Sequence, residues 1–155
     1  MSNAIRTCLW FRDGRGIEAA EFYCSLIPNS KFENSFVGDN GVAVFSVVNF
    51  SLCGVPYQIL DAGPMFSLNE AVSISVATDD QAETDRLWSA LISHGGEETA
   101  CGWLKDRFGM SWQIYPKRLL ELTMHVDKEV SRKAMAAMMK QKKIVITEIE
   151  AAVRS

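Results

Sequence analysis

Apolar and polar residues recur along this chain with two different periods, and the period changes from one segment to the next. In residues 71–77 the apolar Val72, Ile74 and Val76 alternate with polar or small residues, which is the pattern of a strand with two different faces. In residues 17–27 apolar side chains recur every three or four positions and form one face of a helix. The pattern therefore predicts a mixture of strands and amphipathic helices.

The first half of the chain contains one predicted helix, at residues 17–27, within a series of predicted strands. Those strands cover residues 6–11, 31–37, 42–50 and 55–60. The hairpin-type breaks Asp39-Asn40-Gly41 and Cys53-Gly54 separate the last three of them. The first half therefore has the order βαβββ.

The second half follows the same plan after a linker rich in turn residues. Asp80 is a good N-cap for a helix, and Glu83 completes a capping box three residues later. Gly95 and Gly96 end this helix, because glycine readily adopts the left-handed conformation found there. Further strands are expected around residues 101–105 and 111–115.

Two pairs of segments repeat one another. Pro56-Tyr57-Gln58-Ile59-Leu60 is matched by Ser111-Trp112-Gln113-Ile114-Tyr115, and the apolar helix segment 22–27 is matched by residues 87–92. An internal repeat constrains the fold more than any single element. We expect an α+β protein in which two βαβββ modules place curved four-stranded sheets around a shared concavity. The expected modules are residues 1–62 and 63–118, within one compact domain overall.

Residues 119–155 have no counterpart in the first half and are expected to form a C-terminal helical extension. Asp127 is the expected N-cap of a helix that runs to about residue 139. Thr147 and Glu150 form a second capping-box pattern over a short final helix.

Composition narrows the classes of partner. The 155 residues carry a net charge of −3, which argues against an electrostatic nucleic-acid binder. No apolar run is long enough to span a bilayer, so no membrane association is expected. The four cysteines form no C-x-x-C pair and each sits in an apolar segment, so we expect reduced, buried thiols in a cytoplasmic protein.

Two motifs resemble a known family. Cys8-Leu9-Trp10-Phe11, followed by Ala19-Ala20-Glu21-Phe22-Tyr23, is similar to the opening of the PhnB-like branch of the vicinal oxygen chelate superfamily. Residues 101–109, followed by Ser111-Trp112-Gln113-Ile114, resemble the closing part of the same family. The superfamily holds glyoxalase I, bleomycin-resistance proteins and extradiol dioxygenases, and the resemblance covers essentially the whole chain.

This resemblance implies where a metal would bind. Metal-binding members take His, Glu or Gln ligands from the first and last strand of each module. The last-strand positions match Gln58 and Gln113, whereas the first-strand positions, residues 6–8 and 72–73, offer neither histidine nor carboxylate. Two neutral amides suit zinc or iron poorly. We therefore expect no metal and no other cofactor.

Alternation of side chains predicts which residues face the cavity. Leu9, Phe11, Ile59 and Ile114 should meet the helices, so their neighbours along each strand should face the other way. The predicted ligand-binding residues are Cys8, Trp10, Gln58, Ser73, Ser75, Trp103, Gln113 and Tyr115. Aromatic walls with a few hydrogen-bonding groups suit a small organic ligand.

Each of these assignments has a purely structural alternative. Trp10 and Tyr115 could simply fill the concavity, the two glutamines could bond one another or the backbone, and Trp103 could be edge-strand packing. The two serines could be small only so that the sheets can approach each other.

Three functions follow from these observations. The preferred one is a metal-free protein that binds a small molecule. The first alternative is an isomerase, lyase or dioxygenase of the same superfamily with an atypical metal site. The second is a methyltransferase, since proteins of this branch are often labelled 3-demethylubiquinone 3-methyltransferase domain proteins. That chemistry needs a glycine-rich loop between a parallel strand and a helix, which the chain lacks. We also expect a homodimer, because half-barrels leave sheet edges to be covered.

Overall fold

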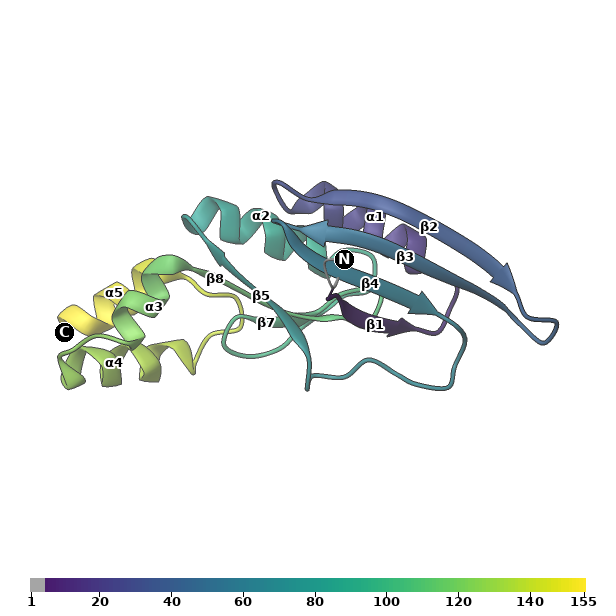
Figure 1. Ribbon diagram of the computed structural model, residues 1–155. Helices are drawn as coiled ribbons and strands as arrows, with labels where there is room; N and C mark the ends of the chain where they lie inside the picture. The colour runs from purple at the N-terminus through teal and green to yellow at the C-terminus, as the bar shows by residue number, and fades with distance from the viewer. Residues whose placement is uncertain (1–4) are drawn as a thin grey trace. The chain divides into compact units, whose positions relative to one another are not determined.

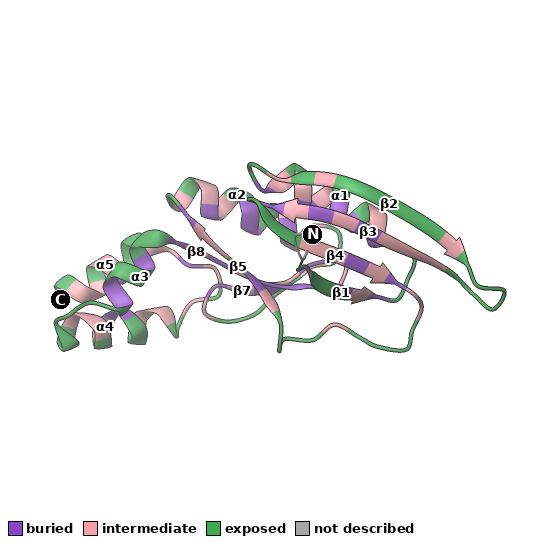
Figure 2. Ribbon diagram, viewed as in Figure 1, coloured by how far each residue is buried: buried purple, intermediate pink, exposed green. Residues whose placement is uncertain are grey.

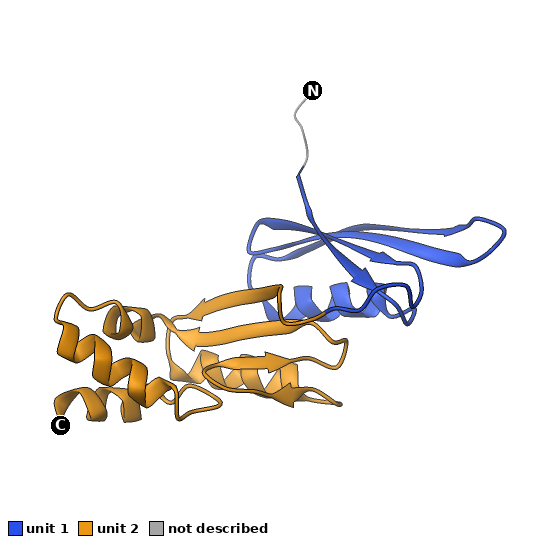
Figure 3. Cartoon of the chain, turned by 90° about the horizontal axis from the view of Figure 1, so that it is seen from below, with its two compact units in different colours: residues 1–68 blue, residues 69–155 orange. Residues whose placement is uncertain are grey.

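The computed structural model describes residues 5–155, and its contacts divide the chain into two compact units. Unit 1 is Met1–Leu68 and unit 2 is Asn69–Ser155 (Figure 3). Each unit contains a four-stranded mixed sheet with a helix packed on it.

Unit 1 has one helix and four strands, in the order β1, α1, β2, β3, β4 (Figure 1). Their bounds are β1 Thr7–Phe11, α1 Gly16–Leu26, β2 Lys31–Asp39, β3 Val44–Leu52 and β4 Val55–Asp61. The strands lie in the order β1-β4-β3-β2, with β1 parallel to β4 and the other pairs antiparallel.

Alternation along these strands separates a buried face from an open one (Figure 2). Leu9, Val48 and Ile59 are almost fully buried, and α1 contributes Ala20 and Tyr23 to the same core. The close approach of α1 requires its first residue to be Gly16, because an added Cβ there would lie 2.8 Å from Cγ2 of Ile59. The helix therefore covers one face of this sheet only.

Asp61, at the end of β4, fixes the start of α1. Its buried carboxylate accepts hydrogen bonds from the backbone N–H of Gly14 at 3.1 Å and of Gly16 at 2.8 Å. The first N–H groups of a helix have no partner within the helix, so a carboxylate placed there satisfies and stabilises them.

Unit 2 repeats the plan and then adds three helices. Its elements are β5 Ser73–Thr78, α2 Gln81–Ile92, β6 Glu97–Glu98, β7 Trp103–Lys105, β8 Ser111–Pro116, α3 Lys117–Thr123, α4 Lys128–Met138 and α5 Ile146–Arg154. The strands lie in the order β5-β8-β7-β6, and β5 runs parallel to β8.

The core of unit 2 is built around two tryptophans. Trp88 on α2 is 2% exposed and Trp112 on β8 is fully buried. The indole N–H of Trp112 donates to the buried carboxylate of Asp106 at 2.8 Å, and Asp106 also accepts from the backbone N–H groups of Phe108 and Met110. This hub closes the turn between β7 and β8.

The three C-terminal helices share a small core of their own, made of Leu119, Leu122, Ala134, Ile144 and Ile149. Tyr115 at the end of β8 packs against it. Because this core meets the sheet through Tyr115, the helical extension belongs to unit 2.

The predicted fold class is confirmed, with two βαβββ modules and C-terminal helices. Asp80 and Asp127 cap their helices as expected, each accepting a hydrogen bond from a backbone N–H. Most element bounds lie within two residues of the prediction.

Four local expectations were wrong or incomplete. The two-residue strand β6 and the short helix α3 were not assigned. The predicted capping box of the last helix does not form: its N-cap is Val145, and Thr147 lies inside α5. Val72 was expected to meet α2, but it precedes β5 and is 51% exposed.

Candidate functional site

The open face of unit 1 carries a row of polar side chains. Gln58 lies opposite Cys8 on β1 and Asn49 on β3 in strand register. Gln58 Nε2 donates to Asn49 Oδ1 at 3.0 Å, and Asn49 Nδ2 donates to Asn34 Oδ1 at the same distance. Since Leu9, between Cys8 and Trp10, is buried, the row lies on the face opposite α1.

Trp10, which lies on β1 two residues after Cys8, is held by the segment that follows β4. Its indole N–H donates to the carbonyl oxygen of Gly63 at 2.9 Å. The ring of Phe66 meets it edge-on, with centroids 4.9 Å apart and planes at 83°. Trp10 is therefore partly covered by its own chain.

The open face of unit 2 brings together all five of its predicted site residues. Gln113 Nε2 donates to Ser73 Oγ at 2.8 Å, and the hydroxyl groups of Ser75 and Tyr115 lie 2.9 Å apart. Trp103 on β7 is the strand-register partner of Gln113. These contacts connect three adjacent strands, β5, β8 and β7.

A pocket of about 210 Å³ opens beside this group. The strands β7 and β8 and the turn before β7 supply Cys101, Trp103, Gln113 and Tyr115. The helical extension supplies Leu119, Leu120, Thr123 and Met138. None of these side chains is charged. Alternation had predicted Gln113 and Tyr115, and Trp103 was a further candidate, but nothing in the sequence placed α3 or α4 beside them.

Unit 1 contains a second, larger pocket of about 350 Å³, which the sequence did not predict. Its charged members are Arg12 and Asp61. Arg12 donates to Ser67 Oγ at 2.7 Å, and both carboxylate oxygens of Asp61 accept backbone N–H groups at the start of α1. Both charged groups thus serve local structure.

The residues at the matched metal positions do not fit a transition metal. They include Cys8 with Gln58 in unit 1, and Ser73 with Gln113 in unit 2. Within residues 5–155 no group of three or more His, Cys, Asp or Glu side chains could hold a metal ion. Apart from the single thiol of Cys8, these side chains are amides and hydroxyl groups, which lack the charge or the imidazole nitrogen that zinc and iron favour.

The expectation of buried cysteines was wrong, although all four are free thiols. Cys8 and Cys53 are exposed, and Cys24 and Cys101 are half-buried. Burial, together with the nearby Glu33, raises the pKa of the Cys24 thiol. A raised pKa keeps a thiol protonated, so Cys24 is a poor nucleophile.

Two βαβββ modules with mixed four-stranded sheets are the architecture of the vicinal oxygen chelate superfamily, and the chain is a member of its PhnB-like branch. The sequence profile of the family described as 3-demethylubiquinone-9 3-methyltransferase matches residues 3–115, so the chain belongs to that family.

Several solved structures resemble the chain. The PhnB protein from Bacillus cereus is 25% identical, with a TM-score of 0.64 over 73% of this chain and 99% of its own. Protein PA1353 from Pseudomonas aeruginosa is 23% identical, with a TM-score of 0.60 over 74% of this chain and 98% of its own. The fosfomycin resistance protein FosX from Listeria monocytogenes shares the fold at 17% identity, with a TM-score of 0.55 over 78% and 96%. No curated protein matches the sequence.

The methyltransferase in the family description finds no support in the structure. The Gly14–Gly16 turn directs two of its N–H groups to Asp61, which leaves no cradle for a cofactor phosphate or carboxylate. Both sheets are mixed, without the doubly wound parallel arrangement that binds dinucleotides.

None of the helices in the described residues has the length and apolar character needed to cross a membrane.

Proposed function

We propose that this protein binds a small, uncharged organic molecule on the open face of a sheet, with the pocket in unit 2 as the principal site. The observation that carries the proposal is the pocket in unit 2, where aromatic and aliphatic walls surround the amide of Gln113. Ligand sites in proteins are commonly apolar concavities with a few placed polar groups. The proposed ligand-binding residues are Cys8, Trp10 and Gln58 in unit 1, and Ser73, Ser75, Trp103, Gln113 and Tyr115 in unit 2.

The proposed function requires no transition metal. The support for this is the chemistry of the groups that would bind a metal. At the matched positions on the last strand of each module, Gln58 and Gln113 offer only neutral amide groups. Metal analysis of the purified protein tests this. One equivalent of tightly held zinc, iron or manganese, lost on changing both glutamines to leucine, would favour an enzyme with an atypical site.

We further propose that the protein is a cytoplasmic homodimer. The strands β1, β2 and β5 are sheet edges within their own units. The hairpin of β2 and β3 exposes Phe36, Val37 and Val44, each more than half accessible. Proteins usually cover such edges. The four free thiols suit a reducing compartment.

A thermal-shift screen of small molecules against the full chain tests the proposed function. A ligand present at about 100 times its Kd raises stability by about 2.7 kcal/mol, which is a measurable shift in Tm. We expect neutral aromatic or heteroaromatic molecules to give the largest shifts. S-adenosylmethionine belongs in the same screen. If it alone binds, the methyltransferase alternative is favoured, and if nothing binds, the proposed function is wrong.

A further inference from the structure

Two neighbouring residues that line the pocket in unit 2 each carry a polar group without a hydrogen-bond partner among residues 5–155. Gln113 uses its Nε2 to bond Ser73, and among residues 5–155 its Oε1 has no hydrogen-bond partner. The indole N–H of Trp103 likewise has none in the described part of the chain. The two residues are register partners on β7 and β8, and Cβ atoms of such pairs lie about 5 Å apart. Both residues line the pocket, so an acceptor and a donor belong to neighbouring side chains of its lining.

A second part of the pocket wall comes from the helical extension. Leu119, Leu120 and Thr123 lie on α3, and Met138 is the last residue of α4. The hydroxyl of Thr123 is engaged with the carbonyl oxygen of Leu119 at 2.9 Å, so this residue presents mainly its methyl group. All four lie beyond residue 115, where the match to the family profile ends. This wall is thus an addition to the two modules that define the fold.

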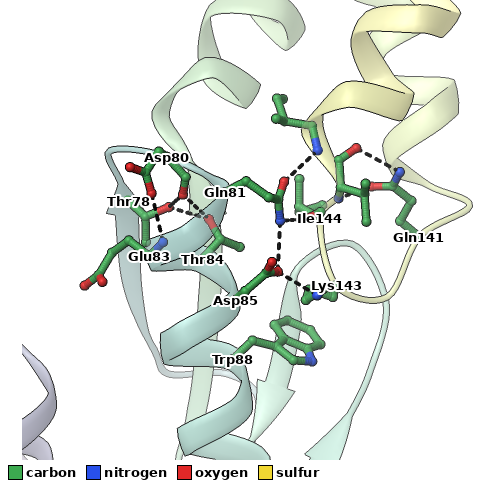
Figure 4. Close-up of polar contacts among 12 residues, drawn as sticks. Thr78, Asp80, Gln81, Glu83, Thr84, Asp85, Trp88, Gln141, Lys143 and Ile144 are labelled. Atoms are coloured by element: carbon green, nitrogen blue, oxygen red, sulfur yellow. Dashed lines mark hydrogen bonds and ion pairs between the residues drawn. The ribbon is translucent and has the colours of Figure 1, made fainter.

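Hydrogen bonds with α2 and with the turn before β7 hold the extension in place. Gln81 donates to the carbonyl oxygen of Ile144 at 2.9 Å and accepts from the backbone N–H of Ile146 (Figure 4). The backbone N–H groups of Cys101 and Gly102 donate to the carbonyl oxygens of Gln141 and Lys142 at 2.8 and 2.7 Å. Gly102 directly precedes Trp103, so the extension is tied to the strand that carries the donor. Both walls are therefore positioned before a ligand arrives.

We propose that this pocket selects a neutral, flat molecule that carries an acceptor and a donor next to each other on one edge, the pattern of a cyclic amide. The inference rests on the proposed function and specifies its ligand class. The ligand carbonyl would accept from the indole N–H of Trp103, and the ligand N–H would donate to Oε1 of Gln113. The helical extension would cover the apolar remainder of the ligand.

The charge and size of the pocket narrow the class further. Its lining contains no cation to balance a carboxylate or phosphonate, and an unpaired charge is costly to bury. Its volume of about 210 Å³ is below the range of roughly 300–1,000 Å³ typical of drug-sized ligands. A compound of one or two fused rings is therefore favoured over a larger molecule or an anion.

Three probes of similar shape test the hydrogen-bonding pattern. We expect 2-quinolinone to bind the full chain and shift the indole N–H resonance of Trp103 in the NMR spectrum, which the Trp103→Phe variant assigns. N-methyl-2-quinolinone lacks the donor, and 2-naphthoate carries a charge. Each should bind about tenfold more weakly or worse, because a polar group of the pocket or a buried charge would be left without a partner.

A matched pair of variants tests the wall supplied by the extension. Leu120 lines the pocket and is 40% exposed, so Leu120→Trp can fill the space with little strain on the core. Met124, 77% exposed at the end of α3, does not line it, and Met124→Trp is the control. We expect Leu120→Trp to weaken 2-quinolinone binding about tenfold, and Met124→Trp to leave it unchanged.

The outcomes separate this inference from the proposed function. If 2-quinolinone does not bind, or if both tryptophan variants bind it equally, the cyclic-amide assignment or the role of the extension is wrong. Binding of other molecules in the thermal-shift screen would still support the proposed ligand-binding function. Tighter binding of 2-naphthoate than of 2-quinolinone would also overturn the inference.

Discussion

The side chain of Gln81, on the first turn of α2, holds the backbone around Ile144 by two hydrogen bonds of 2.9 Å each. One goes from its Nε2 to the carbonyl oxygen of Ile144, and the other comes from the N–H of Ile146 to its Oε1 (Figure 4). Ile146 is the first residue of α5, so this amide caps a helix that lies 65 positions further along the chain. One side chain thereby connects the second module to the helical extension.

We expect Gln81→Leu to destabilise the protein by about 1–3 kcal/mol, because two backbone groups would lose their partners. The same change should weaken binding in the pocket, since α3 and α4 would be less firmly placed. Urea denaturation and titration with 2-quinolinone measure the two effects. Ser89→Leu adds a leucine at an exposed position of the same helix and should change neither. If Gln81→Leu is as stable as the wild-type protein, the two hydrogen bonds of Gln81 to the backbone of Ile144 and Ile146 do not contribute to stability.

Asp106 should be more important for stability than its place in a turn suggests. Its buried carboxylate accepts the indole N–H of Trp112 and two backbone N–H groups. Asp106→Asn places an amide NH₂ against these donors and should cost about 1.5–3 kcal/mol in urea denaturation. Asp79→Asn removes only an exposed ion pair with Lys117 and should leave the stability almost unchanged, because water screens such a pair. Equal losses in the two variants would contradict this account.

The attachment of the extension should weaken in acid. Lys143 hydrogen-bonds Asp85 on α2 at 2.6 Å, and this bond holds the pKa of the aspartate below its ordinary value of 3.8, although burial acts in the opposite direction. Since the folded pKa is the lower one, the stabilisation is complete above 3.8 and is lost as the pH falls through the folded pKa.

Melting temperatures measured from neutral pH down to about pH 3 test this prediction. The wild-type protein should lose stability in acid more steeply than Asp85→Asn. Lys143→Met should remove the same part of the pH dependence, because the partner of the carboxylate is then gone. Parallel curves for the three proteins would show that the pair contributes nothing.

Gln113→Leu should weaken ligand binding while leaving the fold intact. Removing one buried hydrogen-bonding partner costs about 1–3 kcal/mol in binding, or roughly five- to 150-fold in Kd. Ser73 is only half-buried, so its hydroxyl can bond water instead and the Tm should change little. Calorimetry with 2-quinolinone and a melting curve of the same sample measure both effects. Unchanged affinity for a ligand shown to occupy the pocket would remove Gln113 from the site.

Light scattering at micromolar concentration should return twice the 17.3 kDa of one chain. The edge strands and the exposed apolar hairpin of β2 and β3 are the reasons. Changing Phe36, which is 61% exposed, to lysine should weaken the dimer if the hairpin takes part in it. A single-chain mass for the wild-type protein would refute the dimer.

The sequence determined most of the strands and helices and the two faces of each sheet, because these depend on periods that are local to each segment; β6 and α3 are the exceptions. Apolar and polar residues alternate strictly around Ile59 and Ile114. Once a helix packs on the sheet, only the face that carries these two isoleucines can be the buried one. The placement of Gln58 and Gln113 opposite the helices followed from the same alternation. The Asp80 and Asp127 caps were also predictable, since each bonds a backbone N–H within three residues.

Only the tertiary structure decided the rest, because those features depend on residues distant in sequence. The strand β6 is two glutamates long and has no apolar pattern, so its pairing with β7 defines it. The last helix begins at Ile146 rather than at the Thr147 capping pattern, since Gln81 from α2 satisfies its first N–H. The pocket needs Trp103 and Gln113 from the sheet and Leu120 and Met138 from the extension, and only folding brings those segments together.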